Sequence, residues 1–194
     1  MNAQEQLWGG DFGDQYTKRN RVNWLERVPF WTEIIARTGA QSALEVGCNF
    51  GANLLALRAV KPFLNIHGVE INQHAIGQAK SLGFDVHESS ASALEVFRGC
   101  FDLTFTAGVL IHIPPSEINA VMDGIAKASR RYVLAVEYYA AVEEQVEYRG
   151  GMDRLWKRPY GRMYEDMGLK MIDQGFVDSS FGFDSCTWWL LEKQ

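Results

Sequence analysis

From residue 41 onward, short apolar runs alternate with segments in which apolar residues recur every three or four positions. The short runs predict buried strands, and the second pattern predicts amphipathic helices that cover them. The predicted strands span residues 42–46, 63–70, 84–87, 101–107 and 132–139, and the predicted helices between them span residues 52–60, 72–82, 92–97 and 116–129. This alternation is typical of an α/β fold with a doubly wound, mostly parallel sheet.

The pattern changes after residue 139. A polar stretch, residues 140–151, precedes a predicted helix at 160–167 and two predicted strands at 170–178 and 186–192. The turn-rich segment SSFGFD between these strands predicts an antiparallel hairpin that completes a seven-stranded sheet. Residues 1–40 carry two predicted helices, at about 15–27 and 30–37. We expect residues 1–40 to form a helical cap on a domain of residues 41–194, both within one folded unit.

The composition narrows the class of protein. A hydrophobic content of 47 % in 194 residues, with six Trp, is enough for one full core and excludes a disordered chain. A net charge of −5 argues against a protein that holds nucleic acid through a basic surface. Three scattered cysteines without a CxxC pair fit neither a disulfide framework nor a zinc site, and no long uncharged apolar run predicts a membrane span. We therefore expect a cytoplasmic protein with no nucleic-acid or membrane partner.

The segment EVGCNFG, residues 45–51, joins the first predicted strand to the next helix. Gly47 and Gly51 let the backbone approach a ligand beside a helix N-terminus. Glu70 ends the second predicted strand, where a carboxylate can accept ribose hydroxyls. The GxGxxG spacing of dinucleotide sites is absent, and Glu45 would repel a pyrophosphate but attract an amino group. The pattern favours a nucleoside without phosphate; the alternative is a tight connection with a solvated Glu70.

These residues resemble class I S-adenosylmethionine-dependent methyltransferases, and the resemblance extends over essentially the whole chain. It implies S-adenosylmethionine as the cofactor and S-adenosylhomocysteine as the product. It also implies that Glu45, Gly47 and Gly51 surround the methionine part, that Glu70 holds the ribose and that Ile71 packs on the adenine. The chain presents Ser90 and Ala91 where the family usually has Asp-Ala, which is a departure at the adenine amino contact. The expected cofactor site also includes Tyr16, Cys48, Asn49 and Gly108.

Two segments suggest a narrower resemblance. WGGDFGDQYTKRN near the start and EYYAAVEEQVEYRGGMDRLWKR later are similar to small methylases associated with pseudaminic acid (nonulosonic acid) biosynthesis. This resemblance implies a sugar or sugar-like acceptor.

Two residues at predicted strand ends are candidates for the general base. His112 follows the fourth predicted strand, and its side chain titrates near neutral pH. Glu137 ends the run VLAVE, where a carboxylate is hydrogen-bonded or wet. The alternatives are a packed histidine that anchors its loop and a solvated acid. No histidine has the spacing of a metal ligand, so we expect no metal site.

A basic cluster within residues 149–162 reverses the sign of the net charge locally. Arginine binds carboxylates and phosphates through a bidentate fork, so the cluster favours an anionic acceptor; the alternative is a solvated helix face. The predicted acceptor-binding residues are Arg19, Asn20, Tyr139, Tyr148, Arg149, Arg154 and Arg158. For Tyr16 and its neighbours in the cap, the alternative is a surface helix that packs on the domain.

Two hypotheses from different classes follow. The first is an enzyme that transfers the methyl group of S-adenosylmethionine to an oxygen or nitrogen of a small, polar, anionic acceptor, such as a nonulosonic acid or related sugar. The second is a catalytically silent protein of the same fold that binds a nucleoside or serves as a partner subunit. An NAD-dependent oxidoreductase is excluded by the glycine spacing. The sequence leaves the acceptor, the methylated atom and the oligomeric state open.

Overall fold

The computed structural model describes residues 2–20 and 22–194 and contains a seven-stranded sheet of order β3-β2-β1-β4-β5-β9-β8. Five strands are parallel to one another: β1 (Ser42–Val46), β2 (Asn65–Glu70), β3 (Asp85–Glu88), β4 (Phe101–Ala107) and β5 (Ser129–Glu137). The strands β8 (Lys170–Val177) and β9 (Cys186–Glu192) form an antiparallel hairpin on β5. The predicted doubly wound sheet with a C-terminal hairpin is therefore confirmed. A separate two-stranded sheet pairs β6 (Glu144–Gln145) with β7 (Trp156–Lys157).

Alternation along the strands divides the core between the two faces of the sheet. On β5, Val133 and Ala135 pack with α6 (Ile118–Ala128) and α7 (Tyr160–Asp166). Leu134 and Val136 pack on the other face with α3 (Val28–Thr38) and α4 (Ala52–Val60). A smaller cluster joins α5 (Gln73–Ser81) to β3 and α4. Successive residues of a strand point to opposite faces, so one continuous apolar run supplies both layers of the core.

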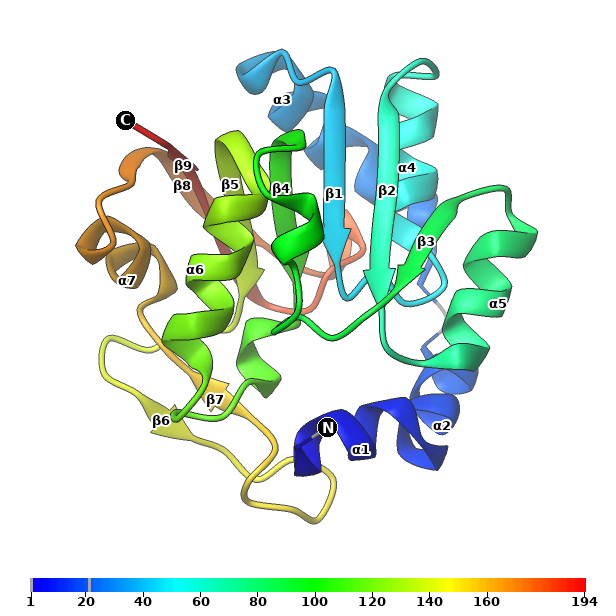
Figure 1. The fold of residues 1–194 in the computed structure, drawn as a ribbon, viewed down its shortest axis with the longest axis vertical. Helices are drawn as coiled ribbons and strands as arrows, with labels where there is room; N and C mark the ends of the chain where they lie inside the picture. The colour runs from blue at the N-terminus through cyan, green and yellow to red at the C-terminus, as the bar shows by residue number, and fades with distance from the viewer. Residues whose placement is uncertain (1, 21) are drawn as a thin grey trace.

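The N-terminal segment forms two short helices, α1 (Ala3–Gly9) and α2 (Asp11–Arg19). The bounds of the predicted helix at 15–27 are therefore wrong, because α2 ends at Arg19 and a separate 3₁₀ turn, η1 (Trp24–Arg27), leads into α3. Three further 3₁₀ turns, η2 (Glu95–Phe97), η3 (Leu110–His112) and η4 (Ser179–Phe181), lie in the connections. In Figure 1 the parallel strands point downward, with α1, α2 and the segment that carries β6 and β7 below their carboxyl ends.

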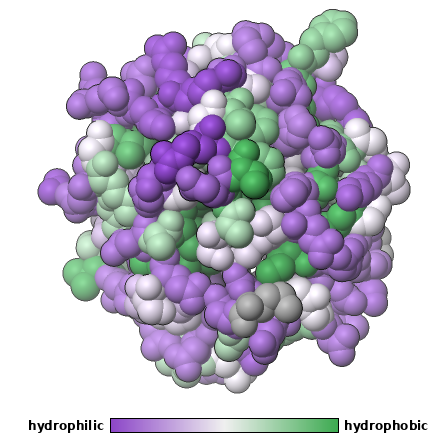
Figure 2. Space-filling model, viewed as in Figure 1, coloured by the Kyte–Doolittle hydropathy of each residue, from purple (hydrophilic) through white to green (hydrophobic). Residues whose placement is uncertain are grey.

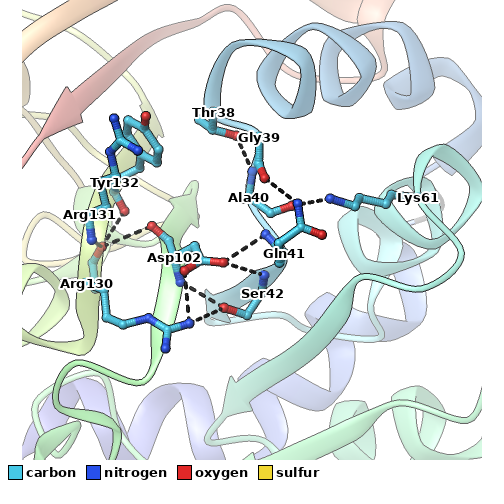
Figure 3. A network of polar contacts seen from close by, with 11 residues as sticks. Thr38, Gly39, Ala40, Gln41, Ser42, Lys61, Asp102, Arg130, Arg131 and Tyr132 are labelled. Atoms are coloured by element: carbon cyan, nitrogen blue, oxygen red, sulfur yellow. Dashed lines mark hydrogen bonds and ion pairs between the residues drawn. The ribbon is translucent and has the colours of Figure 1, made fainter.

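At the opposite edge, polar contacts join the amino ends of three strands (Figure 3). The Asp102 carboxylate accepts the backbone N–H groups of Gln41 at 2.8 Å and Ser42 at 3.1 Å, and it pairs with Arg130 at 2.9 Å. Lys61 donates to the carbonyl of Ala40 at 2.7 Å. This network holds β1, β4 and β5 together at their amino ends, opposite their carboxyl ends.

The face of the molecule seen in Figure 1 is mostly polar. Figure 2 shows hydrophilic residues over most of the face seen in Figure 1, with hydrophobic ones in small groups between them. Within residues 2–20 and 22–194, no helix has the length and apolar content needed to cross a membrane.

Candidate active site

A cavity of about 610 Å³ lies at the carboxyl ends of the parallel strands. The loops after β1, β2, β4 and β5, the helices α1 and α2, and the connection between β8 and β9 all contribute to its wall. This volume is within the usual range for small-molecule and cofactor sites. The cavity is therefore the candidate active site.

The turn after β1 brings backbone, rather than side chain, to the cavity. Gly47 has φ +75°, and a Cβ there would lie 2.5 Å from a methyl group of Val109, so only glycine allows the loops after β1 and β4 to approach this closely. Asn49 adopts φ +48° in the same turn. Asparagine tolerates this left-handed conformation better than most residues, so the turn keeps its shape although a glycine is missing from the dinucleotide pattern.

Glu45, at the carboxyl end of β1, has one oxygen without a partner. The residue is 2 % exposed; its Oε1 accepts the Asn53 amide at 2.6 Å, and its Oε2 finds no donor within the part of the chain that the structure describes. Burial raises the pKa of Glu45 to about 8, although Asn53 and the nearby Arg27 oppose the shift. A buried acceptor at a cavity wall is costly unless a ligand donor meets it. The ammonium group of S-adenosylmethionine fits this donor role.

Glu70, at the end of β2, holds together the loops at the cofactor end. Its carboxylate accepts the N–H groups of Asn49 at 2.8 Å, Ile71 at 2.8 Å and Asn72 at 2.9 Å. Burial raises the pKa of Glu70, and these three donors oppose the shift. Because a carboxylate offers about four acceptor positions, three protein donors leave one, on Oε2, for a ribose hydroxyl.

The helices α1 and α2 are tied to three loops around the cavity. Glu5 accepts the hydroxyls of Ser90 and Ser92. Asn2 donates to Glu117 at 2.6 Å, and Asn72 donates to the carbonyl of Trp8 at 3.2 Å and to Asp14 at 2.8 Å. The cap therefore joins the β3 side of the cavity to the loops that follow β2 and β4.

Aromatic rings connect the cap to the β4 loop. The ring of Trp8 lies 5.2 Å from that of Tyr16 and 4.5 Å from that of His112, which lies 5.2 Å from Tyr148. The indole N–H of Trp8 is buried and has no partner among the described residues. Burial raises the pKa of Tyr16 to about 12, so its phenol stays protonated. These rings form an aromatic part of a wall that is otherwise lined by both polar and apolar residues.

His112 lies in this ring cluster and lines the cavity. Its Nδ1 lies 2.6 Å from the carbonyl oxygen of Arg154. A carbonyl can only accept, so Nδ1 carries the proton and Nε2 keeps a free lone pair. Burial lowers the pKa of His112 to about 4. The ring is therefore neutral near pH 7, and its unprotonated Nε2 is able to accept a proton.

Most residues predicted from the sequence lie together at the cavity wall. Those that line it are Tyr16, Arg19, Asn20, Glu45, Gly47, Cys48, Asn49, Glu70, Ile71, Ser90, Ala91, Gly108, His112, Tyr148 and Arg149. Five others lie outside the lining: Gly51, Glu137, Tyr139, Arg154 and Arg158. The structure therefore does not place these five where they would contact a ligand in the cavity.

Each of these five has another structural place. Gly51, at φ +90°, is the N-cap residue of α4. Glu137 and Arg158 are fully enclosed and bind the backbone of the loop after β4. Arg154 donates to the carbonyl of Arg149. Tyr139 is 52 % exposed and packs on Trp189.

Several residues that line the cavity were not predicted from the sequence. Tyr138 lines the cavity in place of Tyr139 and donates its hydroxyl to Asp184 at 2.9 Å. Arg27 lines it too, and donates to Asn53 at 2.9 Å and to the carbonyl of Gly182 at 3.0 Å. The position of Asn72, two residues after the strand-end Glu70, was a usable signal. Arg27 and Asp184, by contrast, are distant in sequence from every motif.

No cluster of three or more His, Cys, Asp or Glu side chains with metal-binding geometry occurs within the described ranges.

Residues 43–131 match the family model described as a methyltransferase domain. No curated protein sequence matches the chain. The match covers β1 to the start of β5, including the glycine turn, Glu70 and the loop that carries His112.

Several solved structures of similar fold are described as methyltransferases, and their sequence identity to this chain is low. Magnesium protoporphyrin IX methyltransferase from Synechocystis PCC 6803 with bound S-adenosylhomocysteine has a TM-score of 0.75 at 14 % identity, covering 98 % of each chain. A 1,6-didemethyltoxoflavin-N1-methyltransferase from Burkholderia thailandensis has a TM-score of 0.72 at 13 % identity, covering 94 % of this chain and 85 % of its own. The sugar N-methyltransferase KedS8 from Streptoalloteichus sp ATCC 53650 has a TM-score of 0.69 at 14 % identity, covering 96 % and 94 %.

These likenesses show the Rossmann-like methyltransferase fold. With the family match, they confirm the predictions of a methyltransferase enzyme and of S-adenosylmethionine as its cofactor.

Proposed function

We propose that this chain transfers the methyl group of S-adenosylmethionine to an oxygen or nitrogen of a small, anionic, sugar-like acceptor. The observation that carries the proposal is that a buried, unpartnered carboxylate oxygen of Glu45 and a neutral His112 line the same cavity. The first suits the ammonium group of the cofactor, and the second suits a proton acceptor for the nucleophile.

The cofactor end of the cavity extends from Glu45 to Ser90. Glu45 would bind the ammonium group, and the remaining acceptor position on Glu70 would bind a ribose hydroxyl. Ile71, Ser90 and Ala91 line the wall where the adenine is expected. The bound cofactor supplies a methyl group on a positively charged sulfur. The protein contributes mainly alignment of the two reactants, since methyl transfer is an in-line displacement.

The acceptor end lies beside His112. Nε2 of His112 would take the proton that the nucleophile of the acceptor loses when it bonds to the methyl group, with sulfur as the leaving group. The cap helices and the ring cluster exclude water from this region. Nothing in this role requires Glu137 to touch the acceptor, and we therefore assign the base to His112 alone.

The anionic character of the acceptor rests on arginines at the wall. Arg149 lines the cavity and has φ +50°, in a tight turn closed by paired bonds between Tyr148 and Gly151. A non-glycine residue in this conformation costs about 1–3 kcal/mol and persists mainly where the surroundings or function hold it. Arg19, over the rings of Phe12 and Tyr16, is another cation at the wall. A sugar N-methyltransferase among the similar structures supports a sugar-like acceptor.

The experiment measures S-adenosylhomocysteine formed from S-adenosylmethionine with a panel of acceptors at equal concentration. The panel contains a nonulosonic acid (N-acetylneuraminic acid), an anionic amino sugar (N-acetylglucosamine 6-phosphate) and the neutral counterparts N-acetylmannosamine and N-acetylglucosamine. We expect turnover with at least one anionic member and at least tenfold less with its neutral counterpart. Turnover that favours the neutral members would overturn the anionic assignment, and cofactor binding without turnover on any member would favour the catalytically silent alternative.

A further inference from the structure

The loop that carries His112 is held from one side by a buried acid. Glu137, the last residue of β5, is 0 % exposed. Its carboxylate accepts three successive backbone N–H groups, those of Val109 at 3.2 Å, Leu110 at 3.1 Å and Ile111 at 3.3 Å. These N–H groups open the 3₁₀ turn η3, where no side chain of the turn itself caps them. The carboxylate of Glu137 therefore caps the N-terminus of this turn from another strand.

The same loop is held from the other side by a buried base. Arg158 is 1 % exposed, and its guanidinium donates to the carbonyl of Ile113 at 3.0 Å and to that of Leu110 at 3.4 Å. Its Nε pairs with Glu143 at 2.5 Å. An acid thus accepts the N–H groups of residues 109–111, and a base donates to the carbonyl groups of residues 110 and 113. His112 lies inside that segment.

Burying two charged side chains to hold one loop costs free energy. Removing a charge from water costs several kcal/mol unless hydrogen bonds replace its hydration. Apolar residues of similar size would fill the space on both sides at lower cost, but they would leave the N–H groups of residues 109–111 and the carbonyl of Ile113 without these partners. The charges are therefore explained by the conformation that they impose on the loop.

The ring of His112 has a third anchor. Its Nδ1 donates to the carbonyl of Arg154, and Trp8 lies against the ring with centroids 4.5 Å apart. Backbone position, ring tautomer and ring plane are therefore set by separate contacts. If the backbone of the loop moves, the Nδ1 bond breaks and Nε2 loses its fixed direction.

We infer that Glu137 and Arg158 are positioning residues that clamp residues 109–113 so that Nε2 of His112 faces the acceptor. This inference rests on the proposed function, and it replaces the roles of direct base and anion binder that the sequence indicates for these two residues. Neither residue lines the cavity, so both act through His112.

The test follows the His112 ring by nitrogen-15 NMR in the full-length protein, which needs no acceptor. In the wild type we expect the Nδ1-protonated tautomer at pH 7 and a ring that stays neutral down to pH 5. In Glu137→Gln, where an amide N–H replaces one acceptor, we expect averaged tautomer signals and at least tenfold faster amide exchange at residues 109–111. S-adenosylhomocysteine affinity should stay within about twofold, because neither Glu137 nor Arg158 lines the cavity.

The control is Glu192→Gln, an acid at the surface that pairs with Arg131; it should leave the His112 signals unchanged. Arg158→Lys, which keeps a charge but loses the fork, is the second variant and should shift the signals in the same direction as Glu137→Gln. Unchanged His112 signals in both clamp variants would overturn the inference. So would equal changes at His67, His74 and His87, because these would report a general loss of fold. A wild type that fails to bind S-adenosylhomocysteine would contradict the proposed function while leaving the ring signals measurable.

Discussion

At the scale of single residues, we expect binding of the ammonium group of the ligand to be coupled to loss of a proton from Glu45. Burial raises its pKa to about 8, so the free protein holds a proton there at pH 7. An ammonium ligand favours the carboxylate, and binding at pH 7 should therefore release up to one proton per site. Calorimetric titration with S-adenosylhomocysteine in buffers of different ionisation enthalpy measures this release.

Glu45→Gln should abolish the proton release and weaken S-adenosylhomocysteine binding about 10- to 100-fold, since a hydrogen bond to a charged group contributes about 1.5–3 kcal/mol. Glu192→Gln at the surface is the matched control. Binding of undiminished affinity in Glu45→Gln would mean that the ammonium group lies elsewhere.

Arg149 is the residue whose removal should affect the acceptor and leave the cofactor site intact. With S-adenosylhomocysteine present, Arg149→Ala should weaken binding of N-acetylneuraminic acid, used as an anionic probe, at least tenfold. Arg162→Ala, which breaks a surface pair with Asp166, is the control and should have no effect. Equal affinities of the two variants for the probe, measured by ligand-observed NMR, would show that Arg149 does not bind the anion.

Single residues also show where sequence reasoning succeeds and where it ends. Glu45 and Glu70 were predictable because strand ends and a glycine turn locate them at one edge of the sheet. Tyr138 was not, because β5 ends at Glu137 and strand alternation no longer decides which tyrosine faces the cavity. Arg158 resembled an anion binder by composition, but its burial depends on contacts with residues 110–113 that no local pattern encodes.

At the scale of elements, the contact between α1 and α2 sets how the cap lies over the cavity. A Cβ on Gly13 would lie 1.8 Å from the carbonyl oxygen of Trp8 and 2.8 Å from the amide of Asn72. Gly13→Ala should therefore displace α1, accelerate amide exchange in residues 3–9 and weaken S-adenosylhomocysteine binding several-fold.

Gly77, in the middle of α5, is the matched control because a Cβ there meets nothing within 4 Å. Gly77→Ala should leave binding unchanged and stabilise the protein by up to about 1 kcal/mol. If both variants behave alike, the packing of the cap has no influence on the cavity.

The elements themselves were largely predictable from periodicity. The helix at 52–60 and the strands at 42–46, 101–107 and 186–192 match the structure to the residue. The cap was harder, because helices as short as α1 and α2 depend on tertiary contacts such as those of Trp8 and Asn72. The two-residue strands β6 and β7 fall in a polar stretch that carries no alternation.

At the scale of the whole molecule, binding and stability are divided between opposite edges of the sheet. The Asp102 network joins three strands at their amino ends (Figure 3), while the cavity lies at their carboxyl ends. Partial burial opposes ionisation of Asp102, but its backbone donors and Arg130 outweigh this and lower its pKa. A lowered carboxyl pKa contributes stability that is present above about pH 4 and is lost as the pH falls through the folded-state value.

Asp102→Asn should therefore lower the free energy of unfolding by about 1–3 kcal/mol at pH 7, and the difference from wild type should shrink below about pH 4. Urea unfolding at several pH values measures it. Asp123→Asn, which breaks a surface pair with Lys127, should change stability by less than about 1 kcal/mol. A difference between Asp102→Asn and wild type that does not vary with pH would contradict the role given to the carboxylate.

The central claim is that the cavity is built for S-adenosylmethionine. The most direct test is calorimetric titration of the wild-type protein with S-adenosylmethionine and S-adenosylhomocysteine, with NAD as the control. We predict micromolar binding of both sulfur nucleosides at one site per chain, with no binding of NAD because the glycine spacing differs from that of pyrophosphate-binding turns. Absence of binding by either sulfur nucleoside, or equal binding of NAD, would contradict the account.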